Sequence, residues 1–234
     1  MIKLRFCALL AGASYMEHDN RYIFLGPPGS GKGTQAKIMA ENLGVPHIDM
    51  GSTIRAAIKD KTEAGLRAKP YVDAGNLAPP DIVIAMALER LDTNDTKKGF
   101  ILDGYPRSIE QAESLEKYLT KRNMGIKVIN LQYPVEKIVT RLSNRLVCSV
   151  CGAVYNRGTK PSKVEGKCDE CDGSLYVRVD DNPETIRNRF KIYEEETAPL
   201  IGFYSKRGML VDVNADGDIE VITKKIMSAM SSKA

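Results

Sequence analysis

The chain has 234 residues, which is enough for one sizeable domain that carries inserted segments. Its 34 basic and 30 acidic residues give a net charge of +4, which is too balanced for a nucleic-acid coat protein or a polybasic membrane binder. No apolar run approaches the roughly 20 residues that a membrane span requires. We therefore expect a globular protein without membrane partners, whose core rests on aliphatic side chains and Met because Trp is absent.

Residues 1–20 precede the first strand candidate and allow two interpretations. Lys3 and Arg5, followed by the apolar run 6–11, resemble a short signal peptide. Alternatively, the segment is an extension without function ahead of an internal start at Met16. We favour the extension, because short apolar runs of this kind are weak targeting signals.

After this extension, short apolar runs alternate with helical patterns. The strand candidates are 21–25, a segment around His47, 99–103, 127–131 and 209–213. The helical patterns cover 35–43, 81–90, 108–122, 134–145 and 183–206. Strands that alternate with helices predict an α/β fold with one parallel sheet covered on both faces.

Two stretches break this alternation. Residues 55–78 are helical throughout and contain no strand candidate. Residues 148–180 are rich in Gly, Cys and Lys, with short alternating segments at 153–155 and 175–177. We interpret both stretches as insertions into one core rather than as separate domains.

The run GPPGSGKGT at 26–34 follows a strand candidate and precedes a helix, as a phosphate-binding loop requires. Its glycines let backbone N–H groups turn toward a phosphate, and Lys32 can reach the β and γ oxygens. Gly33 stands where a Ser or Thr usually meets magnesium, and the hydroxyl is displaced to Thr34. This displacement favours a nucleotide kinase over a GTPase or a motor ATPase.

Asp103 ends the buried strand candidate 99–103. A carboxylate at the tip of a strand beside a phosphate loop is well placed to hold Mg²⁺ through water. The alternative is an ordinary Asp that caps the next helix, and the nearby phosphate loop favours magnesium.

Four cysteines form two CxxC pairs, Cys148 with Cys151 and Cys168 with Cys171. This spacing is typical of a four-cysteine zinc site, in which two tight turns complete a tetrahedron and leave no open position. The metal would therefore be structural and would hold together a segment too small for its own core. Two disulfides are the alternative. Because reduced thiolates and ATP belong in a reducing compartment, we expect a cytoplasmic protein.

Four segments together resemble the adenylate kinase family: 29–36, 103–107, 180–187 and 197–201. The resemblance runs from Arg21 to the C-terminus, and the cysteines are similar to those of the long-form subset with a zinc-bearing lid. It implies a three-layer fold of the P-loop NTPase type with a five-stranded parallel sheet. Within a core of 21–234, it implies a monophosphate-binding insertion at 50–79 and a zinc lid at 146–180.

The resemblance also implies an activity and its site residues. The reaction would be the reversible, Mg²⁺-dependent transfer of a phosphoryl group from ATP to AMP, which gives two ADP, by a monomer. The residues expected at ATP are Gly29, Ser30, Gly31, Lys32, Gly33, Thr34, Arg141, Arg145, Tyr155 and Gly217. Those expected at AMP are Met50, Arg55, Asn76, Ala78, Gly104, Arg107, Gln111, Arg178 and Arg189. Those expected to act in catalysis are Lys32, Arg107, Arg141, Arg145, Arg178 and Arg189.

One departure from the family keeps the acceptor open. Met50 stands where the family usually has a Thr that contacts AMP, so a UMP, CMP or GMP kinase stays an alternative. A zinc-ribbon protein that binds nucleic acid is a more distant one. Against it, the lysines of 160–167 lie beside acidic residues, and no aromatic side chains are interleaved for base stacking.

Overall fold

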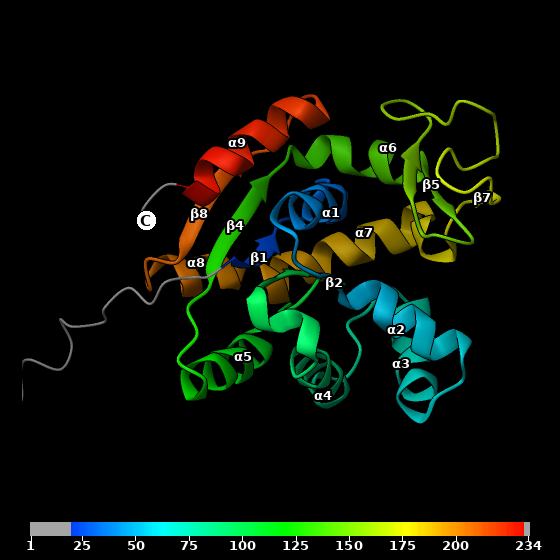
Figure 1. Ribbon diagram of the computed structural model, residues 1–234. Helices are drawn as coiled ribbons and strands as arrows, with labels where there is room; N and C mark the ends of the chain where they lie inside the picture. The colour runs from blue at the N-terminus through cyan, green and yellow to red at the C-terminus, as the bar shows by residue number, and fades with distance from the viewer. Residues whose placement is uncertain (1–19, 232–234) are drawn as a thin grey trace, which may run out of the picture.

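The computed structural model describes residues 20–231, and its centre is a five-stranded parallel sheet (Figure 1). Its strands are β1 (Arg21–Leu25), β2 (His47–Asp49), β3 (Phe100–Asp103), β4 (Lys127–Gln132) and β8 (Leu210–Asn214). They lie in the order β2-β3-β1-β4-β8, and every neighbouring pair is parallel. The predicted sheet is confirmed. The two interpretations of the N-terminal extension concern residues outside the described part.

Helices cover both faces of this sheet, so the predicted three-layer architecture is also confirmed (Figure 1). The covering helices are α1 (Lys32–Leu43), α4 (Pro80–Leu91), α5 (Ile109–Lys121), α8 (Pro199–Ser205) and α9 (Ile219–Ser231). Because side chains alternate along a strand, Ile23 and Leu25 pack with α4, α5 and α8, whereas Tyr22 and Phe24 pack with α1 and α9. No helix within residues 20–231 is long and apolar enough to cross a bilayer.

The strand-free stretch after β2 folds into two packed helices, α2 (Met50–Lys59) and α3 (Glu63–Asp73). The hydroxyl of Thr62 caps α3 by accepting from the backbone N–H of Gly65 at 3.1 Å. Gly65 lies so close to α2 that a Cβ there would come within 2.1 Å of the Ala57 carbonyl oxygen. The predicted helical character of this stretch is confirmed.

The cysteine-rich stretch forms a separate antiparallel sheet, which we call the small sheet. Its strands are β5 (Arg145–Cys148), β6 (Val154–Asn156) and β7 (Leu175–Tyr176), in the order β6-β5-β7. Its apolar cluster is small, with Ala153 and Tyr155 packed between Cys148 and Cys168. The short alternating segments of the sequence at 153–155 and 175–177 overlap β6 and β7.

Two predicted helices are wrong in part. The pattern at 134–145 becomes a short 3₁₀ turn η2 (Val135–Lys137) and a helix α6 (Ile138–Ser143), and Arg145 already begins β5. The pattern at 183–206 becomes α7 (Pro183–Ile192), the π-helical turn η4 (Tyr193–Thr197) and α8. Pro199 has no N–H to donate to a carbonyl of the preceding turn, so the regular helix is interrupted before it and α8 begins at this residue. Two further 3₁₀ turns are η1 (Asn94–Lys98) and η3 (Val179–Asp181).

Candidate active site

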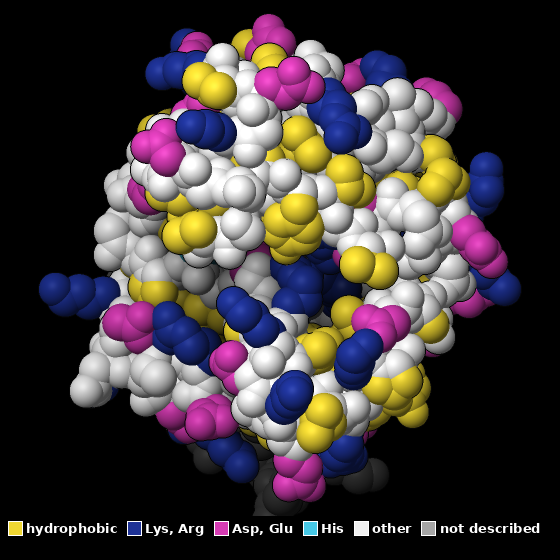
Figure 2. Space-filling model, turned by 90° about the vertical axis from the view of Figure 1, so that its right-hand side faces the viewer, with side chains coloured by type: hydrophobic (Ala, Val, Ile, Leu, Met, Phe, Trp, Pro, Cys, Tyr) yellow, Lys and Arg dark blue, Asp and Glu magenta, His cyan; other side chains and the backbone are white. Residues whose placement is uncertain are grey.

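A cavity of about 560 Å³ opens where β1, β2 and β3 end. Parallel sheets commonly bind ligands at this edge, because the loops there diverge. Figure 2 shows the opening of the cavity as a hollow with Lys and Arg side chains at its base. The basic residues that line it are Lys32, Arg55, Arg107, Arg141, Arg145, Lys160, Arg178 and Arg189.

The loop between β1 and α1 forms one wall of this cavity. Gly29 and Gly31 have positive φ angles of 78° and 93°, which glycine adopts without strain. Gly31 stands at the N-cap of α1, so the positive end of this helix faces the cavity. Lys32 donates to the carbonyl oxygens of Gly26 and Pro27 at 2.7 and 2.8 Å. The backbone therefore has the shape of an anion-binding loop.

Burial lowers the pKa of Lys32 to about 8, and the nearby Asp103 carboxylate offsets only part of this effect. Arg107, Arg189 and Arg145 lower the pKa further by repulsion. A polyanion in the cavity would offset the burial and the repulsion by the arginines. It would raise the pKa of Lys32, because negative charge nearby stabilises the ammonium group.

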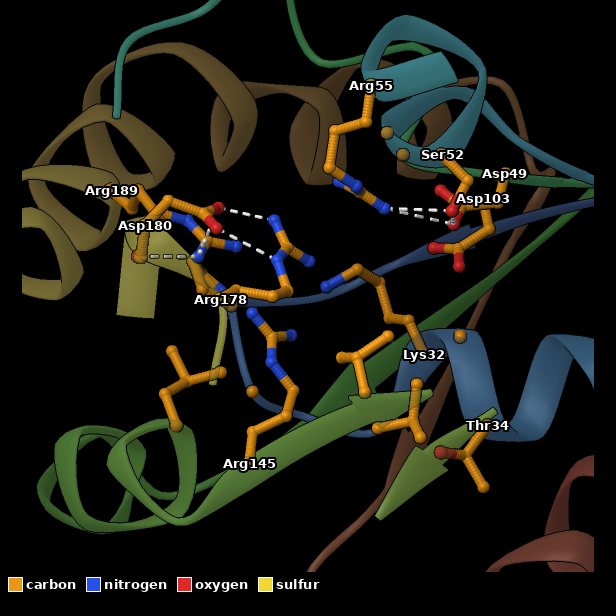
Figure 3. A pocket seen from close by; sticks show the side chains of 18 of the residues that line it. Lys32, Thr34, Asp49, Ser52, Arg55, Asp103, Arg145, Arg178, Asp180 and Arg189 are labelled. Atoms are coloured by element: carbon orange, nitrogen blue, oxygen red, sulfur yellow. Dashed lines mark hydrogen bonds and ion pairs between the residues drawn. The ribbon is translucent and has the colours of Figure 1, made fainter. Parts of the chain in front are cut away.

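On the opposite side, three arginines pair with two adjacent acids, Asp180 and Asp181. Figure 3 shows Arg178 and Arg189 beside Asp180. Arg145 donates from Nε to Asp181 Oδ2 at 2.7 Å, and Arg178 from Nε to Asp180 Oδ1 at 2.8 Å. Arg189 donates to both carboxylates at 3.1 Å. These forked pairs hold the guanidinium groups in place beside the cavity.

The electrostatics of this cluster favour anions. Burial lowers the pKa of Arg189 to about 10, and repulsion from Arg145 and Arg178 adds to this against the attraction of Asp180. For Asp180, burial raises the pKa, but Arg178 and Arg189 outweigh it and the pKa falls below its ordinary value. The arginines therefore stay in a crowded, poorly solvated group that phosphate oxygens would stabilise.

Arg55 enters the cavity from α2, next to Asp49 and Ser52 (Figure 3). Its Nη2 atom donates to the Ser52 hydroxyl at 2.8 Å and lies 3.6 Å from Asp49 Oδ2. The Ser52 hydroxyl in turn donates to the Asp49 carboxylate. Burial lowers the pKa of Arg55 to about 10, and the charge of Arg178 lowers it further.

Arg107 lies beyond the end of β3 and is fixed by the surrounding backbone. Its Nε donates to the Gly104 carbonyl oxygen at 3.0 Å, and its own N–H donates to Gln111 Oε1 at 2.8 Å. The Thr197 hydroxyl donates to the Arg107 carbonyl oxygen at 2.8 Å. The π-helical turn therefore helps to position this arginine.

Asp103 faces the phosphate loop across a narrow gap beside Gly33. A Cβ at Gly33 would come within 3.0 Å of Asp103 Oδ2. His47 Nε2 lies 3.4 Å from the same oxygen. A carboxylate beside a phosphate cradle, with space at Gly33, fits Mg²⁺ held through water.

The four cysteines lie together, and their sulfur atoms are all within 4.8 Å of one another. The Cys148 to Cys171 and Cys151 to Cys168 sulfur distances are 3.5 and 3.6 Å. All four are free thiols rather than disulfides. Tetrahedral zinc with Zn–S bonds of about 2.3 Å places its sulfurs about 3.8 Å apart, so the cluster fits a structural zinc ion.

Comparison with known proteins agrees with this geometry. The family model described as "Adenylate kinase" matches residues 24–209. The adenylate kinase of Thermodesulfovibrio yellowstonii is 48% identical over 91% of this chain and 100% of its own length. Those of Archaeoglobus fulgidus and Methanothrix thermoacetophila are 48% and 47% identical, over 87% and 89% of this chain and 94% and 97% of their own lengths. The chain belongs to the adenylate kinase family.

Most residues predicted from the resemblance to adenylate kinases do line the cavity. On the phosphate-loop side these are Gly29, Gly31, Lys32, Gly33, Thr34, Arg141, Arg145 and Tyr155. On the α2 side these are Arg55, Asn76, Ala78, Gly104, Arg107, Gln111, Arg178 and Arg189. Their roles toward each nucleotide stay predictions.

Three predicted residues do not line the cavity: Ser30, Met50 and Gly217. Ser30 is 1% exposed and turns inward beneath the loop. Met50 is fully buried and packs in the core with Ile48, so its side chain cannot take over the contact of the usual Thr. Gly217 lies in the connection between β8 and α9.

Tyr155 lines the cavity, and its hydroxyl accepts from the Asp169 N–H at 2.7 Å and contacts Cys168 Sγ at 3.4 Å, so it also supports the cysteine cluster. Arg141 lies in α6, whereas Arg145 begins β5 and is not part of the helix predicted at 134–145. Both still reach the cavity from a helix and a strand.

Sequence reasoning missed Asp49 and Ser52, which line the cavity beside Arg55. A signal was present, because residues 49, 52 and 55 are spaced by three and therefore share one face of a helix. The family motif does not point to them, because the contact that it implies comes from a Thr at position 50.

Proposed function

We propose that the cavity binds ATP and AMP end to end and that the chain carries out the family's reaction there. This reaction is the reversible transfer of the terminal phosphoryl group of ATP to AMP, which gives two ADP. The observation that carries the proposal is the convergence of a phosphate loop and seven of the cavity's cations on one space. These cations are Lys32, Arg55, Arg107, Arg141, Arg145, Arg178 and Arg189.

We place the ATP phosphates on the loop before α1. The backbone N–H groups of 29–34 and the helix N-terminus suit the phosphate oxygens, and Ser30 would take part through its backbone. Lys32 would leave the carbonyl oxygens of Gly26 and Pro27 for the phosphates. Arg141, whose guanidinium carbon lies 4.7 Å from the Tyr133 ring centre, would approach from α6.

We place AMP between α2 and the end of β3. Arg55 and Arg107 would bind its phosphate with their planar forks. The residues around its adenine and ribose would be Asn76, Ala78, Gly104 and Gln111. Gln111 is 2% exposed and uses its oxygen on the Arg107 N–H, which leaves its amide N–H₂ to read the base.

Transfer between the two phosphates passes through a loose transition state whose charge spreads over the equatorial oxygens. Arg145, Arg178 and Arg189 would neutralise this charge, moving from Asp180 and Asp181 toward the phosphates. Asp103 would hold, through water, the Mg²⁺ bound with ATP, and this ion would supply positive charge for the β and γ oxygens. Because alignment and charge dominate, the reaction needs no general base.

The two insertions would act as moving covers over this site. We propose boundaries of 50–79 for the AMP-binding insertion and 146–180 for a zinc lid, within a core of 21–234. Lid closure would exclude water, which competes with AMP for the phosphoryl group. We further propose a cytoplasmic monomer that does not bind nucleic acid.

A coupled assay of ADP formation tests the proposal. ATP at a fixed concentration is combined with AMP, UMP, CMP or GMP, with the Lys32→Ala variant as the inactive control. AMP should be the preferred acceptor. Preference for another monophosphate would overturn the placement of AMP, and equal activity of the Lys32→Ala variant would overturn the assignment of the loop.

A further inference from the structure

Arg55 sits in an unfavourable place for a cation when no nucleotide is bound. Burial disfavours its charge, Arg178 and Arg107 repel its guanidinium group, and the attraction of Asp49 and Asp180 opposes these effects. A flexible side chain in this position would turn toward solvent unless something on its own helix held it. The contact that holds it comes from Ser52.

Ser52 makes two hydrogen bonds in opposite directions. Its hydroxyl donates to the Asp49 carboxylate and accepts from Arg55 Nη2 at 2.8 Å. An ionised carboxylate can only accept, so Asp49 fixes the direction of the hydroxyl proton and leaves the hydroxyl lone pairs for Arg55. The direct distance from Asp49 to Arg55 is longer, at 3.6 Å, so the Ser52 hydroxyl supplies the hydrogen bond and Asp49 adds a direct electrostatic attraction.

The local backbone is adapted to this chain of contacts. Asp49, Ser52 and Arg55 lie three residues apart, on the face of α2 that lines the cavity. A Cβ at Gly51 would come within 3.0 Å of Arg55 Nη1 and 3.2 Å of Asp49 Oδ1. Glycine therefore leaves room for both side chains across the first turn of the helix, where a larger residue would crowd them.

We infer that Asp49 is a positioning residue that orients Arg55, through Ser52, for the phosphate of the acceptor nucleotide. Met50 is buried in the core, so its side chain cannot hold Arg55. The inference rests on the proposed placement of AMP beside α2. Asp49 itself is not assigned a contact with either substrate.

Steady-state kinetics on a small set of variants tests this inference. The variants are Asp49→Ala, Ser52→Ala, Arg55→Ala and the Asp49→Ala/Arg55→Ala pair, with Asp60→Ala as the matched control. Asp60 is an exposed acid at the far end of α2. Its removal changes the net charge by the same amount, at a distance from the cavity.

Loss of the contact should raise the KM for AMP about tenfold in Asp49→Ala and in Ser52→Ala, as expected for a hydrogen bond to a charged group. The KM for ATP should change by less than about twofold, because the phosphate loop is untouched. In the Arg55→Ala background, removal of Asp49 should have almost no further effect, because the partner is gone.

Three outcomes would overturn the inference. These are an unchanged or lower KM for AMP in Asp49→Ala, a parallel rise in the KM values of both nucleotides, or additive effects in the double variant. Failure of the underlying placement gives a different result, since Arg55→Ala would then leave the KM for AMP unchanged. Ser52→Ala keeps the test open if Asp49→Ala does not fold.

Discussion

The five-stranded core and the small sheet are stabilised in different ways. In the core, both faces of the sheet are buried under helices, and two large apolar clusters hold the layers together. The small sheet buries only four residues, two of which are Cys148 and Cys168. Burial of apolar area can stabilise the core, whereas so small a cluster needs a metal or another crosslink.

The same contrast separates the two halves of the proposed site. The phosphate loop and Asp103 are fixed by strands in the centre of the core. Arg145 and Arg178 lie at the borders of the small sheet and are held by Asp181 and Asp180. We infer that the core supplies a preformed cradle and that the small sheet supplies groups that can move.

The largest expected effect follows from removing one metal ligand. The Cys168→Ser variant should lose its zinc and the order of the small sheet, because metal binding and local folding are coupled at such sites. We expect ADP formation to fall more than about tenfold, since the arginines lose their alignment. Metal content by native mass spectrometry and the coupled assay measure both effects.

The core should remain folded in this variant, and thermal unfolding checks that point. Cys7→Ser is the control for loss of a thiol outside the four-cysteine cluster. Retained zinc with full activity in Cys168→Ser would contradict the assignment of the cluster.

A substitution that leaves a cavity in the core should lower the stability of the fold and leave the zinc site intact. Leu115 on α5 is 1% exposed, so Leu115→Ala should lower the free energy of unfolding by about 2–5 kcal/mol. Zinc content should not change, because the small sheet does not depend on α5. Denaturant titration measures the stability, and Leu66→Ala, at an exposed site, should have little effect. A loss of zinc in Leu115→Ala would contradict the independence of the two regions.

The pH dependence of ATP affinity should separate the contribution of Lys32, in the phosphate loop, from that of the arginines. The pKa of Lys32, lowered by burial to about 8, lies below its ordinary value of 10.5. Since ATP needs the charged amine, its affinity should fall about tenfold per pH unit above 8. Between 8 and 10.5 the unfolded chain binds more protons, so this group makes the folded state more stable as the pH rises.

Calorimetric titration with a non-hydrolysable ATP analogue measures this pH dependence. In the Lys32→Arg variant the side chain stays charged, so the affinity should not vary between pH 8 and about 9, below the pKa of about 10 of Arg55 and Arg189. The same slope in both proteins would show that another group titrates.

The smallest expected effect concerns a contact between the two regions. Lys37 on α1 pairs with Glu170, between two of the cysteines, at 3.0 Å. Both side chains are nearly half exposed, so the pair should contribute less than about 1 kcal/mol. Lys37→Ala should change the KM for ATP by less than about threefold, and exposed Lys97→Ala serves as the control. A tenfold change would mean that this pair holds the small sheet closed.

The sequence predicted the core and the cysteine cluster well, because both depend on local patterns. Strand β1, the glycine loop and Asp103 follow from runs of adjacent residues, and paired cysteines follow from spacing. Features set by packing between distant segments were missed. Arg145 begins a strand that pairs across the small sheet, the turn at 193–197 precedes Pro199, and Asp49 and Ser52 matter only because α2 faces the cavity.

The most direct test of the central claim, direct transfer between two nucleotides in one cavity, follows the fate of the phosphoryl group itself. ATP labelled at its γ-phosphate is incubated with AMP, Mg²⁺ and the zinc-loaded protein. The account predicts that the label appears in ADP, with little in inorganic phosphate, because both nucleotides lie in one closed cavity. Label that appears mainly in inorganic phosphate, or that stays in ATP, would contradict it.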